Sequence, residues 1–102
     1  MVKIKFSNQQ LGSFCRKWKI RELALFGSVI RNDFRPDSDV DVLVSFLPDE
    51  HWTTFEWLDM QAELAAMFGR KVDLVSRRGI EHSRNALRRK AILESAEVCY
   101  AA

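Results

Sequence analysis

Residues 26–46 read FGSVIRNDFRPDSDVDVLVSF and contain the two features from which the expected fold is built. The alternating stretch 20–26 predicts a strand, and Gly27-Ser28 directly after it predicts a tight turn. The apolar, β-branched run 40–47 predicts a second, buried strand that ends at a Pro-Asp pair. A glycine turn and an Asp-Val-Asp strand start are therefore separated by one short crossover.

The Asp-Val-Asp sequence places two acids at the start of the second strand. Asp39 and Asp41 are two residues apart, and residues two apart on a strand point to the same face. We therefore expect two carboxylates side by side, which repel each other unless a cation lies between them. A hard, oxygen-ligated ion such as Mg²⁺, shared with substrate phosphates, satisfies this arrangement.

The Gly-Ser turn has the residue types of a phosphate-binding loop. Gly27 allows the backbone to approach a phosphate closely. Ser28 is a plausible N-cap of a short helix over 28–32, where the helix dipole favours negative charge. Residues 33–38 have turn chemistry and complete the crossover to the acidic strand.

A third acid, Asp73, lies among apolar residues in a predicted third strand over 72–75. An acid inside an otherwise buried strand is costly unless it has a partner or a task. If this strand lies beside the second, Asp73 reaches the same cluster. There it could take the proton from an attacking hydroxyl or hold a metal ion.

The remaining segments predict helices that alternate with strands. The apolar spacing of residues 54–68 assigns Phe55 and Leu58 to the core face of a helix, and Leu87 has the same role in a basic helix over 83–95. A first helix over 8–18 and a final strand or tail over 98–100 complete the chain. This order predicts an α/β (α+β) domain, with helices packed on a small mixed β-sheet.

Composition supports one small globular domain over residues 1–102. The chain is 47% hydrophobic and 29% charged, and no apolar run approaches the length of a membrane span. No signal-peptide core is visible, and two cysteines are too few for a disulfide scaffold, so we expect a cytoplasmic protein without membrane contact. A net charge of +2 is too balanced to predict nucleic-acid binding.

Two further groups of side chains have more than one interpretation. The basic cluster at residues 77–90 is either a solvated face or a patch for an acidic partner or nucleotide phosphates, and Arg84 and Arg88 are expected on one helical face. Nucleic acid is disfavoured because no aromatic residues interleave with the cluster. Trp52 or Trp57 could stack on a base or face a partner, whereas Cys15 is expected to be inert packing.

The motif as a whole resembles the G-S-x-x-R-G-x-x-x-x-x-S-D-x-D signature of the nucleotidyltransferase superfamily related to DNA polymerase β. The small size is similar to that of the minimal, MntA-like nucleotidyltransferases of prokaryotes. One position departs from the signature, because Asn32 stands where the family usually has glycine; asparagine tolerates the left-handed conformation well. The residues that carry the resemblance are Gly27-Ser28, Arg31, Asp33, Pro36, Ser38-Asp39 and Asp41.

The resemblance implies a nucleotidyltransferase fold with an NTP and Mg²⁺. Gly27 and Ser28 would hold the triphosphate, and Arg31 and Ser38 would lie near the phosphates. The catalytic and metal-binding acids would be Asp39, Asp41 and Asp73.

Members of this family commonly act as the antitoxin of a type VII toxin–antitoxin system. The resemblance therefore implies transfer of AMP from ATP to a tyrosine hydroxyl of a HEPN-type ribonuclease toxin. Two alternatives stay open: a small-molecule acceptor such as an aminoglycoside, and a non-catalytic antitoxin that acts by occlusion. No segment reads a base edge, so the base preference of the NTP is not predicted. The position of the acceptor residue in the toxin and the stoichiometry with the partner are not predicted either.

Overall fold

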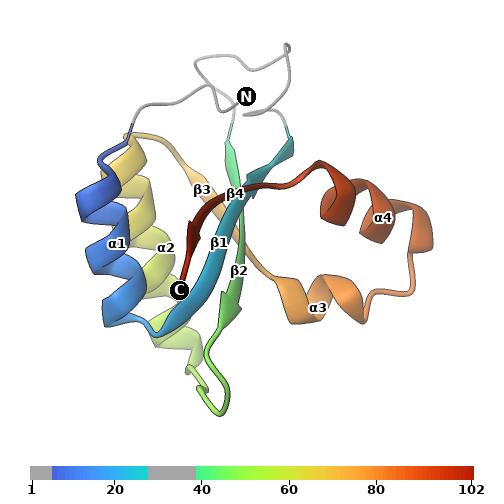
Figure 1. Cartoon of the computed structure of the whole chain (residues 1–102), viewed down its shortest axis with the longest axis horizontal. Coiled ribbons are helices and arrows are strands. Elements are labelled where there is room, and N and C mark those ends of the chain that lie inside the picture. The colour runs from blue at the N-terminus through green and yellow to red at the C-terminus, as the bar shows by residue number, and fades with distance from the viewer. Residues whose placement is uncertain (1–5, 28–38) are drawn as a thin grey trace.

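A computed structural model of the chain describes residues 6–27 and 39–102 (Figure 1). Within these residues no helix is long and apolar enough to cross a membrane. The described helices are α1 (Asn8–Lys17), α2 (Thr54–Phe68), α3 (Arg77–Glu81) and α4 (Ala86–Ser95). The described strands are β1 (Ile20–Phe26), β2 (Val40–Phe46), β3 (Val72–Ser76) and β4 (Glu97–Ala101).

The strands form one mixed sheet in the order β3-β2-β1-β4. β1 pairs antiparallel with β2 and with β4, whereas β2 and β3 run parallel. The predicted mixed sheet is therefore confirmed, and the 98–100 segment is the edge strand β4 rather than a tail.

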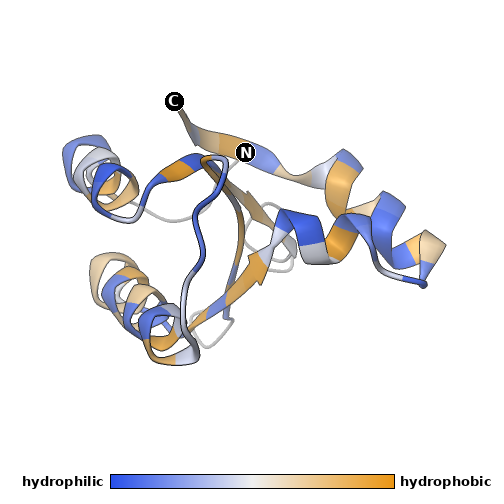
Figure 2. Cartoon of the chain, turned by 90° about the horizontal axis from the view of Figure 1, so that it is seen from below, coloured by the Kyte–Doolittle hydropathy of each residue, from blue (hydrophilic) through white to orange (hydrophobic). Residues whose placement is uncertain are grey.

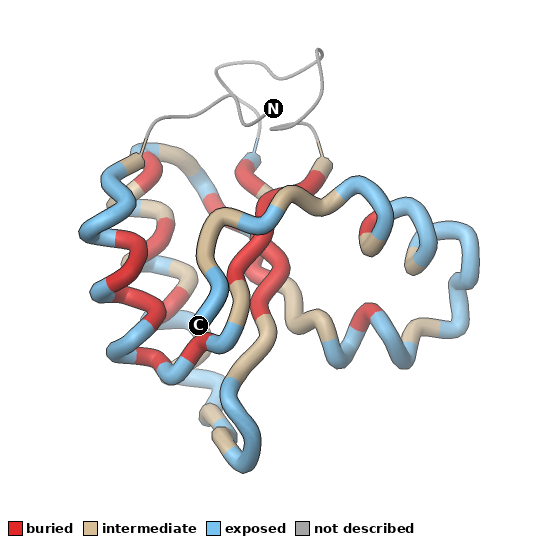
Figure 3. Tube along the Cα trace, viewed as in Figure 1, coloured by how far each residue is buried: buried red, intermediate tan, exposed pale blue. Residues whose placement is uncertain are grey.

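Helices cover both faces of this sheet. α1 and α2 lie together on one face, and α3 and α4 lie on the other (Figures 1 and 2). The first face holds the main core, in which Val40, Val42 and Val44 of β2 are fully buried against α1 and α2. The second face holds a smaller cluster, in which Leu43 packs with Ile80 of α3 and Ile92 of α4, among others. In Figure 3 the buried residues accordingly concentrate in the sheet and in the two helices of the first face.

The bounds of α2 follow from its end residues. Thr53 and Glu56 form a capping box, in which each side chain accepts a hydrogen bond from the other residue's backbone N–H. Gly69 ends the helix in the left-handed conformation, with φ of 67°. The predicted helix 54–68 is confirmed at both ends.

Three residues that were expected on the core faces of two helices are exposed instead. In α2, Phe55 is 81% exposed and Leu58 is 52% exposed, whereas Met60 and Leu64 are fully buried. In α4, Leu87 is 83% exposed and the buried residue is Ile92. Both helices contain apolar residues on more than one side, so the helical period alone does not select the face that meets the sheet.

The predicted helix 83–95 is also corrected. α4 begins after Asn85, whose side chain accepts a hydrogen bond from the backbone N–H of Arg88. Arg84 therefore precedes α4 and does not share a helical face with Arg88. The short helix α3 was not predicted; it starts directly after β3, with Ser76 as its N-cap.

Smaller differences concern element ends and the crossover. α1 ends one residue before the predicted Trp18, β2 ends at Phe46, and β3 continues to Ser76. The helix expected over 28–32 and the turn expected over 33–38 lie outside the described residues.

Candidate active site

Two of the three predicted acids are brought together by the parallel pairing of β2 and β3. Asp41 pairs directly with Asp73 in the register of the two strands. Paired residues of neighbouring strands project to the same face, and neighbouring strands are about 4.8 Å apart. Both carboxylates line one pocket on the face covered by α3 and α4. The condition set by the sequence, that the third strand lies beside the second, is thus met.

Gly27 lies against the same acids. It follows β1, whose last residue Phe26 pairs with Asp41, and it has a φ of 75°, a conformation that favours glycine. A Cβ atom added at this position would overlap Oδ2 of Asp41. The absence of a side chain therefore allows the backbone of Gly27 to lie close to the carboxylate of Asp41.

The pocket has a volume of about 410 Å³ and opens where β1 ends and β2 and β3 begin. The strands form one wall and α4 forms the other. The strand side contributes Phe26, Gly27, Asp41 and Asp73, and the helix side contributes Arg88, Ala91, Ile92 and Ser95.

Carboxylate oxygens are the donors that Mg²⁺ prefers, so Asp41 and Asp73 fit a shared divalent ion. Asp39 is exposed, precedes β2 and does not line this pocket. Within residues 6–27 and 39–102, no three His, Cys, Asp or Glu side chains are grouped closely enough to hold a metal ion. The structure therefore joins Asp41 with Asp73 and leaves Asp39 apart. The predicted site residues Ser28, Arg31 and Ser38 lie outside the described residues.

The helical wall was missed by the sequence analysis. The spacing i, i+3, i+4, i+7 of Arg88, Ala91, Ile92 and Ser95 places them on one face of α4. In the sequence, the signal was an isoleucine, Ile92, with small and polar residues at helical spacing around it. It could be recognised only with the correct helix start at Ala86 and with the knowledge that α4 packs on the acidic face.

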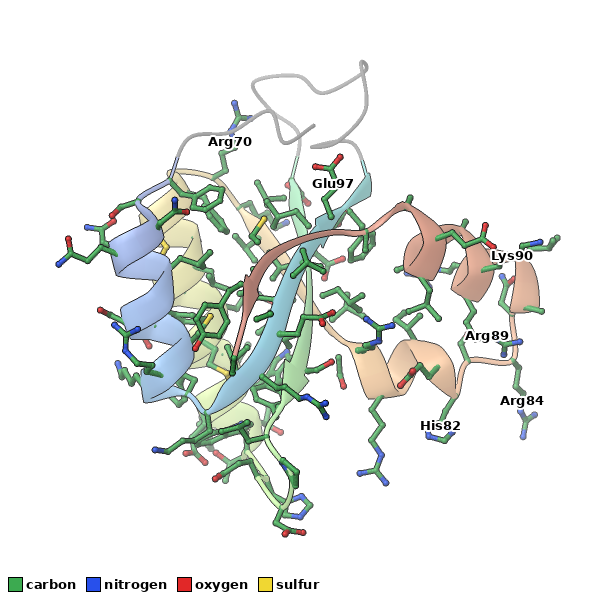
Figure 4. All side chains as sticks on the ribbon, viewed as in Figure 1. Arg70, His82, Arg84, Arg89, Lys90 and Glu97 are labelled. Carbon is green, nitrogen blue, oxygen red and sulfur yellow. The ribbon has the colours of Figure 1, made fainter. Side chains whose placement is uncertain are left out.

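The basic cluster divides into residues with different surroundings. Arg77 forms an ion pair with Glu22 at 3.0 Å, and Nη1 of Arg89 donates to the Ser83 carbonyl at 2.7 Å. Arg84 and Lys90 lie at the end of the α3–α4 pair that is far from the sheet (Figure 4). Arg88 alone of the predicted cluster lines the acidic pocket.

The aromatic residues near the start of α2 contact one another and the core. Phe46 packs against Trp52 and Trp57, with ring centroids 6.0 Å apart in each pair, and Trp18 meets Trp52 edge to face at 5.3 Å. None of these rings lines the acidic pocket. The expectation that Phe55 is the core residue of this group is wrong, because Trp52 and Trp57 pack on the core and Phe55 does not.

Comparison with known proteins identifies the family. The sequence matches the family described as Nucleotidyltransferase domain over residues 7–99, a stretch that contains Gly27, Asp41 and Asp73. The chain therefore belongs to the nucleotidyltransferase domain family, as its motif predicts.

Two curated relatives are similar over part of their length. Protein adenylyltransferase MntA of Thermococcus cleftensis is 34% identical over 65 residues, which cover 64% of this chain and 64% of that protein. The candidate protein adenylyltransferase MJ1379 of Methanocaldococcus jannaschii is 33% identical over 66 residues, which cover 65% of this chain and 66% of that protein. The match thus spans just under two thirds of each relative.

Solved structures share the fold. A candidate minimal nucleotidyltransferase is 30% identical, with a TM-score of 0.66 over 88% of this chain and 86% of that chain. A toxin–antitoxin structure with AMP-PNP superimposes with a TM-score of 0.70 over 94% of this chain and 74% of that chain, at 18% identity. The predicted nucleotidyltransferase fold is confirmed.

Proposed function

We propose that this chain is a Mg²⁺-dependent protein adenylyltransferase that transfers AMP from ATP to a tyrosine hydroxyl of a HEPN-type ribonuclease toxin. The observation that carries the proposal is the pairing of Asp41 with Asp73 beside Gly27 in one open pocket. Within the nucleotidyltransferase domain family, this arrangement has the two parts that phosphoryl transfer needs. One is an acidic site and the other is a close backbone approach for phosphates.

In the proposed reaction the acceptor oxygen attacks the α-phosphorus of ATP. A new oxygen–phosphorus bond forms, the bond from the α-phosphorus to its bridging oxygen breaks, and pyrophosphate leaves. Asp73 is exposed at the pocket and takes the proton from the attacking hydroxyl. Gly27 and Ser28 hold the triphosphate, and Arg31 and Ser38 lie beside it.

Asp41 and Asp73, with Asp39, would hold the metal ion. When bound, Mg²⁺ would offset the mutual repulsion of the carboxylates and the negative charge of the phosphates. Asp39 lies just before β2, two residues ahead of Asp41 in the chain.

The protein acceptor is supported by the names of similar proteins. The relative from Thermococcus cleftensis is a protein adenylyltransferase called MntA. A structure with the same fold is the toxin–antitoxin complex MntA-HepT, and another contains a tri-AMPylated HEPN toxin of Shewanella oneidensis with its antitoxin. An open pocket at the end of a small sheet suits an acceptor that brings its own reacting residue.

The test uses ATP labelled at the α-phosphate. The purified chain is incubated with Mg²⁺, labelled ATP and the product of the neighbouring gene, and tryptic peptides of the labelled protein are sequenced by mass spectrometry. We expect label on a tyrosine of the neighbour with wild-type protein and none with Asp41→Asn. Asp59→Asn, which removes an exposed acid from α2, is the matched control and should transfer normally.

Other outcomes distinguish the alternatives. If the toxin is silenced by mixing without ATP, and no label is transferred, occlusion is the function. If neither protein is labelled but an added aminoglycoside is, the acceptor is a small molecule. Label on the neighbour that persists with Asp41→Asn would contradict the proposed site.

A further inference from the structure

The helical wall of the pocket contains a cation whose task the reaction described above does not assign. Arg88 lies on the face of α4 that continues through Ala91, Ile92 and Ser95 toward the sheet. Ile92 is only 7% exposed and anchors this face in the second core cluster. Arg88 lies one turn away from that anchor and is exposed at the pocket that also contains Asp41 and Asp73.

The backbone of Arg88 is held in place while its side chain is left to solvent. The N-cap Asn85 accepts a hydrogen bond from the Arg88 backbone N–H at 3.0 Å. In the described parts of the chain, the guanidinium of Arg88 has no ion pair or hydrogen bond. By contrast, Arg77 is paired with Glu22 and Arg89 with the Ser83 carbonyl. Arg77 and Arg89 are therefore engaged within the fold, whereas the guanidinium of Arg88 is available to a ligand of the pocket that it lines.

The charge of the pocket indicates which ligand that is. A nucleoside triphosphate brings several negative charges to a site whose strand wall already contains two carboxylates. A guanidinium on the opposite wall offsets this charge, and its planar array of donors matches the oxygens of a phosphate bidentately. The acids and Gly27 face the triphosphate from the strand side, and Arg88 faces it from the helix side. Since the β- and γ-phosphates carry most of the negative charge of the triphosphate, they are the groups that a guanidinium on the helix side would attract most strongly.

We propose that Arg88 binds the β- and γ-phosphates of the nucleotide and the pyrophosphate that leaves. This inference rests on the proposed function, and it adds a binding residue from α4. When the bond from the α-phosphorus to the bridging oxygen breaks, negative charge grows on the β-phosphate. Donors placed at that charge stabilise the transition state as well as the bound substrate.

The test compares the binding of ATP and AMP, because AMP lacks the two phosphates that Arg88 would contact. Isothermal titration calorimetry with Mg²⁺ and the full chain measures both dissociation constants for wild type, Arg88→Gln and Arg88→Lys. Arg84→Gln is the matched control, since it removes the same charge from the segment just before α4 and does not line the pocket. Thermal unfolding of each variant verifies that it is folded.

For Arg88→Gln we expect ATP binding to weaken about 10- to 100-fold, the range of a charge-assisted hydrogen bond, with AMP binding unchanged. Arg88→Lys should recover part of the loss, and Arg84→Gln should bind both nucleotides like wild type. Pyrophosphate, titrated alone, should lose affinity with Arg88→Gln in the same way as ATP.

Three results would overturn the assignment. ATP affinity unchanged in Arg88→Gln means that Arg88 contacts no phosphate. An equal loss for ATP and AMP places its effect on the nucleoside or on the fold rather than on the terminal phosphates. An equal loss of ATP affinity in Arg84→Gln would mean that ATP binding depends on the net positive charge of the protein and not on a contact made by Arg88. Failure of the proposed function looks different: wild type would label no acceptor while ATP binding still depended on Arg88.

Discussion

The two faces of the sheet differ in the size of the core that they bury. On the α1/α2 face, Leu11, Val42 and Leu64 are each at most 1% exposed and belong to one continuous core. On the α3/α4 face, the helices contribute Ile80 and Ile92 to a smaller cluster, each still 7% exposed. The acidic pocket opens beside this smaller cluster.

The main core and the candidate site therefore lie on opposite faces of the same strands. In β2, Val40 and Val42 point to the dense core while Asp41, between them, points to the pocket. The alternation of side chains along a strand makes this division possible with one residue for each role. Changes on the first face should therefore affect folding, and changes on the second should affect transfer.

The largest effect is expected on the pocket face. Asp73→Asn should lower the rate of AMP transfer by about 10²- to 10⁴-fold, the usual contribution of a general base. Its free energy of unfolding should stay the same or rise, because the repulsion with Asp41 is relieved. Transfer kinetics and urea unfolding measure the two quantities, with Asp59→Asn as the control. A large loss of stability in Asp73→Asn would contradict the division of roles between the faces.

A matched pair of leucines tests the core face. Leu64→Ala, at a fully buried position of α2, should lower the free energy of unfolding by about 2–5 kcal/mol. Leu87→Ala, at a position of α4 that is 83% exposed, should change it by no more than about 0.5 kcal/mol. Both are followed by urea unfolding. Equal losses would mean that Leu87 is buried in solution, for example by a second chain.

Gly69 and Gly27 have similar φ angles, 67° and 75°. Substitution of each by alanine separates the cost of backbone strain from the cost of crowding by the added methyl group. Gly69→Ala has open space around the added methyl, so only its positive φ costs stability, about 1–2 kcal/mol. Gly27→Ala has the same strain and also crowds Asp41, so it should lose more stability and most of its transfer activity. Unfolding and transfer assays on the two variants measure the difference. If Gly27→Ala transferred AMP at the wild-type rate, a close backbone approach at this turn would not be needed.

The smallest effect concerns the thiol inside the α1/α2 core. Burial raises the pKa of Cys15 from 9.0 to about 12. The folded state therefore keeps a proton that the unfolded state loses, and stability falls as the pH rises from about 9 toward 12. Between pH 8 and pH 10, the free energy of unfolding should fall by about 1.4 kcal/mol more in wild type than in Cys15→Ala. Urea unfolding at the two pH values measures it, and identical losses in both proteins would show that the thiol is accessible to water.

The ends of α2 could be predicted from the sequence, but the residues that face the sheet could not, and the reason is physical. The bounds of α2 were correct, because the end residues Thr53 and Gly69 act through hydrogen bonds and backbone angles local to the helix. The assignment of Phe55 to the inward face of α2 was wrong, since Phe55 and Met60 both fit a helical period and only contact with the sheet distinguishes them. The five-residue helix α3 is too short to show a period at all.

The candidate site also combines residues that local sequence reveals with one that only packing reveals. Gly27, Asp41 and Asp73 were identified from residue type and from their places at predicted strand ends. Arg88 was noted only as one member of a basic cluster, because the sequence does not state which face of α4 meets the sheet. The structure brings Gly27, Asp41 and Asp73 together, but their roles stay predictions, as do those of Asp39, Ser28, Arg31 and Ser38.

Sequence alone was sufficient to identify the family and the first three strands, and to select Gly27, Asp41 and Asp73 as candidate site residues. These depend on residue type, on short spacing and on the period of two along a strand, all of which are local properties. Tertiary packing was needed to bring Asp73 into register with Asp41 and to close the pocket with α4. Strand pairing and helix docking join segments far apart in the chain, and which segments meet depends on how the whole core packs. No stretch of the sequence carries that information in isolation.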